Sequence, residues 1–89
     1  MQFEWDESKR LSNLDKHGID FIGAMDLFDG RPEWTSRSAY GFEERYVTTG
    51  LIEDRFVTVV WTRRSDKIRL ISARRARDGE ERACRAVHN

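Results

Sequence analysis

Cysteine is nearly absent from this chain of 89 residues, in which Cys84 is the only one. A single cysteine excludes an internal disulfide and a zinc knuckle built on several cysteines, and it suits a reducing compartment. Long apolar runs are missing too, since no stretch approaches the roughly 18 residues of a membrane span. The first residues have no cationic segment followed by an apolar one, the pattern of a secretion signal. We therefore expect a cytoplasmic protein that does not associate with membranes.

Metal-ligand spacing is also missing, because the acidic residues are scattered along the chain. We expect neither a metal ion nor another cofactor. The length leaves room for one domain with a modest core, which we assign to residues 1–89. Hydrophobic residues make up 38% of the chain and aromatic residues 11%, too many for a disordered protein. The chain should therefore fold.

Net charge is zero, but the charge is unevenly distributed. Residues 1–30 hold seven acids and three bases, whereas residues 62–77 hold seven bases and one acid. This second segment creates a local positive field that attracts phosphates although the whole molecule is neutral.

The first helix is predicted over residues 7–17. Asp6 is placed to cap its start, and Gly18 to end it in the left-handed conformation. Leu11 and Leu14 lie three positions apart, which places them on a common face that we expect to point inward.

A second helix is predicted over residues 21–28 by helical spacing of its apolar residues. These residues are Phe21, Ala24, Met25 and Phe28. A last helix is predicted to begin at Asp78, the first residue of a D-x-x-E capping box, and to end near Val87. Because its apolar residues are few, this helix is marginal unless it docks on the rest of the molecule.

Alternating patterns begin after the helix-breaking segment 29–32. They predict strands over residues 33–40, 44–52, 55–63 and 67–75, and residues 2–5 also read as a short strand. Tight turns at Glu53-Asp54 and Ser65-Asp66 imply antiparallel neighbours. We expect an α+β fold in which two N-terminal helices pack on a four-stranded, mainly antiparallel sheet with a short C-terminal helix.

Cations are concentrated on the last predicted strand. Strict alternation would point Lys67, Arg69, Ile71, Ala73 and Arg75 to one face, and Ile68, Leu70, Ser72 and Arg74 to the other. Arg69 stands out, because a cation in mid-strand between apolar neighbours is rarely placed without a partner. The turn at Ser65-Asp66 should bring Arg63 and Arg64 near it, so a bound phosphate would meet several cations.

RNA cleavage needs little more than such a cluster. The ribose 2′-hydroxyl already lies beside its own phosphate, so an enzyme must align the attack, stabilise charge and manage two protons. The planar guanidinium group of arginine suits the second task, because it donates two hydrogen bonds to a phosphate and keeps its positive charge. For the protons, His17 and His88 are the only histidines, and Glu80 and Glu81 are the acids nearest the arginines.

Structural explanations compete with each of these functional ones. An arginine-rich strand is often a solvated or salt-bridged sheet face, and His17 in a last helical turn is more often a cap than a catalyst. The tryptophans and tyrosines could stack bases, yet in a small domain they more often form the core. Composition alone leaves the function open.

Two separate sequence blocks resemble the BrnT toxin family. The first is Phe3-x-Trp5-Asp6-x-x-Lys9-x-x-x-Asn13-x-x-Lys16-His17-Gly18-Ile19-x-Phe21. The second is Thr62-x-Arg64, followed by Arg69-x-Ile71-Ser72-Ala73-Arg74-x-Ala76 and Glu80. The blocks occur in the family's order and span nearly the whole chain.

The resemblance implies a RelE-like ribonuclease fold and toxicity through RNA cleavage and translation arrest. It also implies a BrnA antitoxin, whose ribbon-helix-helix domain binds operator DNA, so that the toxin would reach DNA only through the antitoxin complex. Carried over residue by residue, Arg64, Arg69, Arg74 and Glu80 match the family's closing motif, and Lys16-His17 matches the opening one. Our hypothesis is that the three arginines hold the scissile phosphate and that His17 or Glu80 assists proton transfer. The remaining nearby cations should bind RNA: Arg63, Lys67, Arg75 and Arg77. The alternative is a basic binding module or co-repressor subunit that does not cut RNA.

Overall fold

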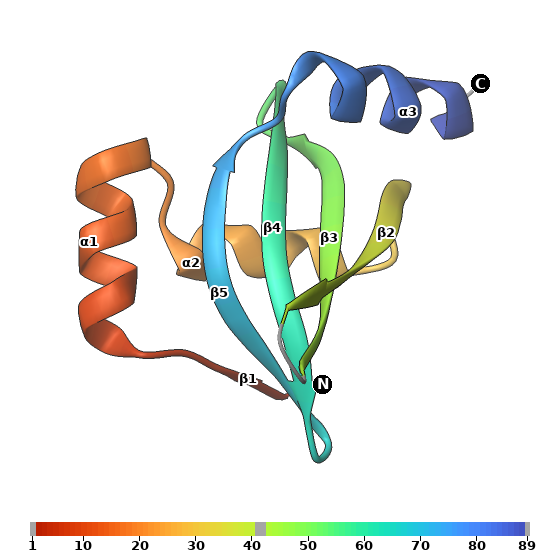
Figure 1. The fold of residues 1–89 in the computed structure, drawn as a ribbon. Helices are drawn as coiled ribbons and strands as arrows, with labels where there is room; N and C mark the ends of the chain where they lie inside the picture. Colours follow the sequence, from red (N-terminus) through yellow and green to blue (C-terminus); the bar gives the residue numbers. More distant parts are fainter. Residues whose placement is uncertain (1, 41–42, 89) are drawn as a thin grey trace.

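The computed structural model describes residues 2–40 and 43–88. In Figure 1 the helices lie around one sheet. In chain order the elements are β1 (Gln2–Glu4), α1 (Glu7–His17), α2 (Phe21–Ala24), the 3-10 turn η1 (Met25–Phe28), β2 (Glu33–Tyr40), β3 (Glu43–Ile52), β4 (Arg55–Arg64), β5 (Lys67–Arg75) and α3 (Asp78–His88). In the residues described, no helix has the length and apolar character needed to cross a membrane.

The sheet has five strands in the order β1-β5-β4-β3-β2. Neighbours are antiparallel except for β1, which runs parallel to β5 and makes the sheet mixed. The prediction of a four-stranded sheet is therefore wrong. The short first strand joins the sheet through pairing with residues more than sixty positions away, and local sequence patterns do not reveal such a partner.

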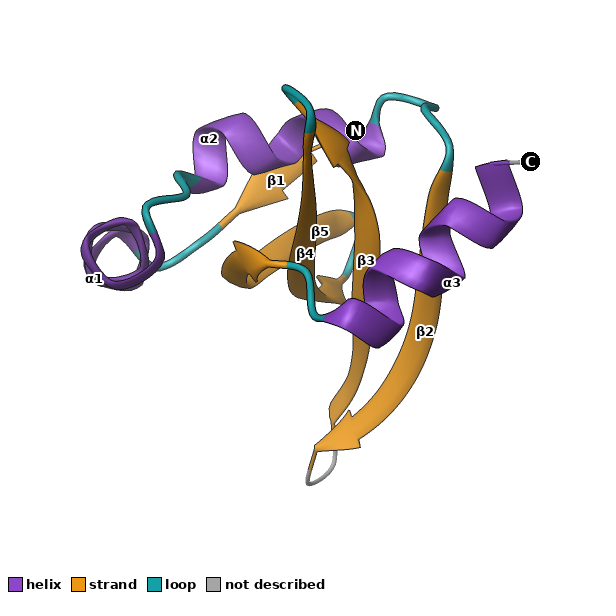
Figure 2. Ribbon diagram, turned by 90° about the horizontal axis from the view of Figure 1, so that it is seen from above, coloured by secondary structure: helices purple, strands orange, loops and turns teal. Residues whose placement is uncertain are grey.

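Helices cover both faces of the sheet, as the view from above shows (Figure 2). α1, α2 and η1 lie on one side, and α3 lies on the other side over β2 and β3. The expected arrangement, with two N-terminal helices packed on a four-stranded sheet, is therefore also wrong in its layers, because helices cover both faces of the sheet. The core lies between η1, α2 and the central strands, where Phe21, Leu27, Val59 and Leu70 are almost fully buried.

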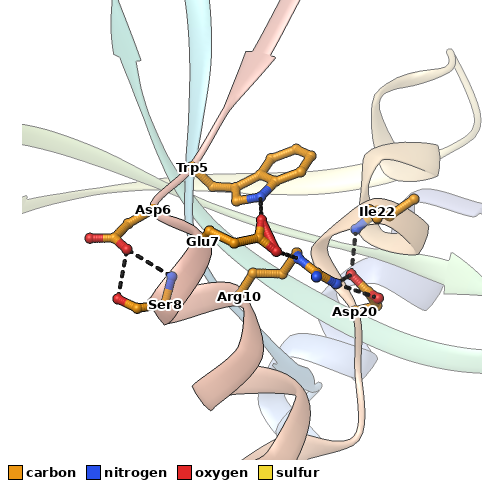
Figure 3. Close-up of polar contacts among 7 residues, drawn as sticks. All are labelled: Trp5, Asp6, Glu7, Ser8, Arg10, Asp20 and Ile22. Atoms are coloured by element: carbon orange, nitrogen blue, oxygen red, sulfur yellow. Dashed lines mark hydrogen bonds and ion pairs between the residues drawn. The ribbon is translucent and has the colours of Figure 1, made fainter.

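Helix α1 begins and ends where the sequence predicts. The Asp6 carboxylate accepts a hydrogen bond from the Ser8 backbone N–H at 2.9 Å, and Gly18 ends the helix at φ +69°. Arg10 joins the helix to the start of α2, donating to the Asp20 carboxylate at 3.0 Å and also pairing with Glu7 (Figure 3).

The predicted inner face of α1 is wrong. Leu11 and Leu14 are 53% and 38% exposed, and the buried residue of the helix is Asn13. The reason is that α1 packs beside the edge of β5, where unpaired backbone groups need a polar partner. The Asn13 amide donates to the carbonyls of Ile19 at 3.0 Å and Ala73 at 2.8 Å, and it accepts from Ala73 N–H at 3.1 Å.

Residues 21–28 form two short pieces instead of the one predicted helix, a single turn of α2 followed by η1. Tightening to the 3-10 geometry buries Leu27 and leaves Met25 partly buried. Phe28 packs edge-to-face on Trp61 of β4 with ring centroids 5.3 Å apart.

Turns between the strands match the prediction. Glu53 and Asp54 both have positive φ, as does Ser65, which is typical of tight hairpins. β4 lies in the interior of the sheet, as its apolar and β-branched residues indicate.

Helix α3 has few apolar residues and is stabilised by packing on the rest of the molecule. Cys84 is fully buried, and its thiol donates to the Thr49 carbonyl at 3.3 Å. Arg85 lies over the Phe56 ring at 4.7 Å from the centroid. The predicted capping box is shifted by one residue, because the Glu80 carboxylate accepts from the Arg77 backbone N–H at 2.8 Å.

Candidate nucleic-acid interface

One extra residue in β5 decides which side chains share a face of the sheet. Two successive residues of β4 face Leu70 and Ser72, so Ile71 between them has no partner on that strand. A bulge of this kind shifts the alternation of the side chains beyond it. As a result, Leu70 and Ala73 are both buried in the core although they lie three positions apart.

The bulge places Arg69 and Arg74 on the same face, the one turned away from α1 and α2. Arg69 lies opposite Thr62 of β4, and Arg74 lies opposite Thr58. The prediction from strict alternation put these arginines on opposite faces and is wrong. Its error is the assumption that β5 pairs without interruption.

Three cations gather at the end of this face where β4 turns into β5. Arg64 and Lys67 face each other across the two strands, and Arg69 follows two positions further along β5. Helix α3 lies at the opposite end of the sheet (Figure 1). Arg64 and Lys67 are exposed, and within residues 2–40 and 43–88 neither makes an ion pair. We call Arg64, Lys67 and Arg69 the basic face.

Arg69 has a partner, as its mid-strand position predicts. Parallel pairing of β1 with β5 sets Glu4 beside it, and the guanidinium donates to the Glu4 carboxylate at 2.7 Å. The two side chains are 25% and 31% exposed, so both remain accessible to solvent. A phosphate that binds Arg69 would therefore compete with one partly solvated carboxylate.

Arg74 belongs to a different network, in which Glu80 is the centre. The Arg74 guanidinium donates two hydrogen bonds to the Glu80 carboxylate, at 2.8 and 2.9 Å. Thr58 also donates to Glu80 at 3.0 Å, and its hydroxyl lies 2.7 Å from that of Thr49. The pKa of Glu80 is lowered to about 2, mainly by the hydrogen bonds that its carboxylate accepts from Arg74. Glu80 thus stays ionised near neutral pH, where so weak a base is a poor proton acceptor.

The three arginines of the closing motif share a face, but they do not gather on one phosphate. Arg69 and Arg74 are five positions apart, which corresponds to about 15 Å along an extended strand. Each is held by its own carboxylate, Glu4 or Glu80. The basic face can therefore contact one phosphate group, and Arg74 anchors α3 at the other end of the sheet.

His17 lies away from the basic face, in the last turn of α1. It is half-buried, and it lines a hollow together with residues of α1 and the edge of β5. Ser72, which points to the same side of the sheet as Arg69, also lines this hollow. The side chain of His88 lies outside the described residues.

The other predicted RNA-binding cations are dispersed. Arg63 points to the opposite face, with its guanidinium carbon 5.9 Å from the Trp61 ring centroid. Arg75 pairs with Val57 on the core side of the sheet, and Arg77 precedes α3. All three arginines are exposed. Of the four cations in this set, only Lys67 belongs to the basic face.

Sequence reasoning missed Glu4 and Thr58 as partners of the arginines. Thr58 is fully buried in mid-strand, and the alternation of β4 is the signal that places it on the arginine side. Glu4 gives no such signal, since its partner lies 65 positions away. Among the residues that the structure describes, no three His, Cys, Asp or Glu side chains are grouped to hold a metal ion.

Comparison with protein families gives one match. A family model described as "Ribonuclease toxin, BrnT, of type II toxin-antitoxin system" matches residues 5–80. The matched region begins just after β1 and includes α1, α2, η1, strands β2 to β5 and the first three residues of α3, of which Glu80 is the last. No curated protein matches the chain.

Proposed function

The chain belongs to the BrnT family of ribonuclease toxins of type II toxin–antitoxin systems, and from this premise we propose that it cleaves RNA at its basic face without a metal ion. Cleavage in the cytoplasm would arrest translation and growth. The observation that carries the proposal is the placement of Arg64, Lys67 and Arg69 on one open face, two of them without a carboxylate partner in the described chain.

These cations suit the charge that develops during cleavage. Attack of the 2′-hydroxyl on the adjacent phosphate increases the negative charge on the phosphoryl oxygens, and fixed cations stabilise that charge. Arg64 and Arg69 can each donate paired hydrogen bonds to a phosphate, while Lys67 adds a point charge. Every role in this scheme is assigned to a protein side chain.

For proton transfer, the geometry favours His17 over Glu80. Glu80 is occupied by Arg74, Thr58 and a backbone N–H, and its pKa of about 2 opposes proton uptake. We assign Arg74 and Glu80 as positioning residues that hold α3 and the end of β5. His17 lines a hollow shared with Ser72, and RNA crossing the β5 edge would bring its ribose toward that histidine.

Membership of a type II system implies an antitoxin protein. We propose a BrnA-like antitoxin with a ribbon-helix-helix domain that covers the toxin and carries it to operator DNA. Co-expression with a ribbon-helix-helix protein encoded beside the toxin gene should restore growth. If no ribbon-helix-helix protein encoded beside the toxin gene restores growth, this assignment is contradicted.

Cleavage is tested by incubating the purified protein with RNA in the presence of EDTA and mapping new ends. The variant Arg64→Gln/Lys67→Gln should lose at least tenfold in kcat/KM, because each phosphate contact contributes on the order of 1 kcal/mol or more. Arg55→Gln/Arg82→Gln is the matched control, since it removes two exposed cations that lie off the basic face. Equal rates in the two double variants would remove the basic face from the mechanism.

One observation favours a second function, in which the chain binds RNA without cutting it. Arg69 and Arg74 are already neutralised by Glu4 and Glu80, as in a salt-bridged sheet face. Stoichiometric, salt-sensitive binding that yields no new RNA ends would support this function over cleavage.

A further inference from the structure

Beside the edge of β5, outside the basic face, lies a second cationic site. It is a hollow of about 220 Å³ lined by Lys9, Ser12, Lys16 and His17 of α1 and by Ile71 and Ser72 of β5. We call it the α1 hollow. The two lysines are seven positions apart, which places them on the same side of the helix.

The residues that line the α1 hollow supply no carboxylate to its lysines, although Asp6, which lies outside the hollow, attracts Lys9. No acidic residue lines it. In the described part of the chain, no ion pair involves Lys9, Lys16 or His17. This contrasts with Arg69 and Arg74, each of which has a carboxylate. The α1 hollow therefore holds two lysines without an ion-pair partner in the described chain, although α1 lies in the acidic third of the sequence.

Ser72 connects the α1 hollow with the side of the sheet that carries the basic face. Beyond the Ile71 bulge, Ser72 lies on the same side of the sheet as Arg69, and it also lines the α1 hollow. β1 pairs only with residues 67–69, so this part of the β5 edge is not covered by a strand. Asn13 occupies the backbone groups of Ala73, which leaves the lysine ammonium groups and the two serine hydroxyls for a ligand.

We propose that the α1 hollow is a second phosphate subsite for RNA, which binds a phosphate flanking the one on the basic face. The inference rests on the proposed RNA binding by this chain. Lysine ammonium groups and serine hydroxyls donate hydrogen bonds to phosphate oxygens, and single-stranded RNA presents its phosphates at regular intervals. An RNA strand crossing the β5 edge at Ser72 would engage both sites.

The test measures binding of a 2′-O-methyl oligoribonucleotide, which keeps its phosphates but cannot be cleaved. The variant Lys9→Gln/Lys16→Gln should weaken binding about tenfold and lower the slope of log affinity against log salt by roughly 0.7, since the loss of one neutralised phosphate on a single strand changes that slope by about 0.7. Arg55→Gln/Arg82→Gln, which removes the same charge elsewhere, should leave both quantities within twofold of the original protein.

Length dependence separates a subsite from a general charge effect. A dinucleoside monophosphate has one phosphate, so Lys9→Gln/Lys16→Gln should bind it as the unaltered protein does. Equal weakening on both RNA lengths, or weakening matched by the control variant, would overturn the proposal. So would unchanged RNA binding accompanied by a loss of antitoxin affinity, since the α1 hollow would then hold an acidic protein segment.

Failure of the subsite can be told from failure of the proposed function. Binding of uncleavable RNA does not require catalysis, so a protein that never cuts RNA still reports on the α1 hollow. Conversely, normal cleavage with unaltered affinity and salt slope in Lys9→Gln/Lys16→Gln would leave the ribonuclease intact and remove the subsite.

Discussion

At the scale of single residues, Asn13 takes the place of a missing strand at the β5 edge. Its amide closes two hydrogen bonds with the backbone of Ala73, the pattern that a neighbouring strand would supply, and a third with Ile19. The side chain is 8% exposed, so water does not replace these bonds easily if they are broken.

Replacement of Asn13 by alanine should lower the free energy of unfolding by about 2–4 kcal/mol, because it leaves buried backbone groups unpaired. Asp15→Ala on the exposed side of the same helix should change it by less than about 0.5 kcal/mol. Urea titration followed by circular dichroism measures both. A loss in Asn13→Ala as small as that in Asp15→Ala would show that the amide bonds contribute little.

Ionisation of Glu80 should make the free energy of unfolding depend on pH. Its pKa is lowered from 4.5 to about 2, so its stabilising effect is complete above pH 4.5 and disappears as the pH falls toward 2. Glu80→Gln should lower the free energy of unfolding at pH 7 by about 3 kcal/mol at most, given 1.36 kcal/mol per pKa unit. The difference between the two proteins should narrow between pH 4.5 and 2. A difference that stays constant across this range would contradict the cause assigned to the pKa.

At the scale of elements, β3 passes close under η1 at Gly50. A Cβ added there would lie 2.5 Å from the Leu27 Cδ2 atom, which belongs to a 2% exposed core side chain. Gly23 in α2 has no such neighbour within 4 Å.

Gly50→Ala should therefore destabilise the protein by about 1–3 kcal/mol through overpacking. Gly23→Ala should be neutral or stabilising by up to about 1 kcal/mol, because alanine is the better helix former. Thermal unfolding of the two variants makes the comparison. Equal midpoints would mean that Leu27 moves aside without cost.

Helix ends and turns that depend on adjacent residues were predictable from the sequence. Features that depend on the pairing of strands far apart in the chain were not. Asp6, Gly18 and the turn at Glu53-Asp54 act on their immediate neighbours, so their residue types suffice. The bulge at Ile71 depends on how β4 and β5 pair, and its sequence is that of a regular strand. The basic segment was visible in the sequence, but the shared face of Arg69 and Arg74 follows from that bulge.

At the scale of the whole molecule, a chain of aromatic contacts ties the first strand to the middle of the sheet. Phe3 packs on Phe28 at 5.3 Å between ring centroids, Phe28 packs on Trp61 at 5.3 Å, and Trp61 stacks on Tyr46 at 4.5 Å. These rings connect β1, η1, β4 and β3 within one core. We expect the molecule to unfold as one unit.

Phe3→Ala should lower the free energy of unfolding by about 2 kcal/mol, less than a fully buried phenylalanine, because Phe3 is only partly buried. In each of the two proteins, tryptophan fluorescence and far-ultraviolet circular dichroism should report one common urea midpoint, which is lower in the variant. Separate midpoints for the two signals would show that β1 detaches before the rest unfolds.

Parallel pairing of β1 with β5 also bears on how the protein is made. Translation proceeds from the first strand to the fifth, and Glu4 must wait until Arg69, 65 positions later, has left the ribosome. The edge that carries the basic face is thus completed late in synthesis. During that interval most of the chain has emerged, while the surface that we propose for RNA is still unfinished.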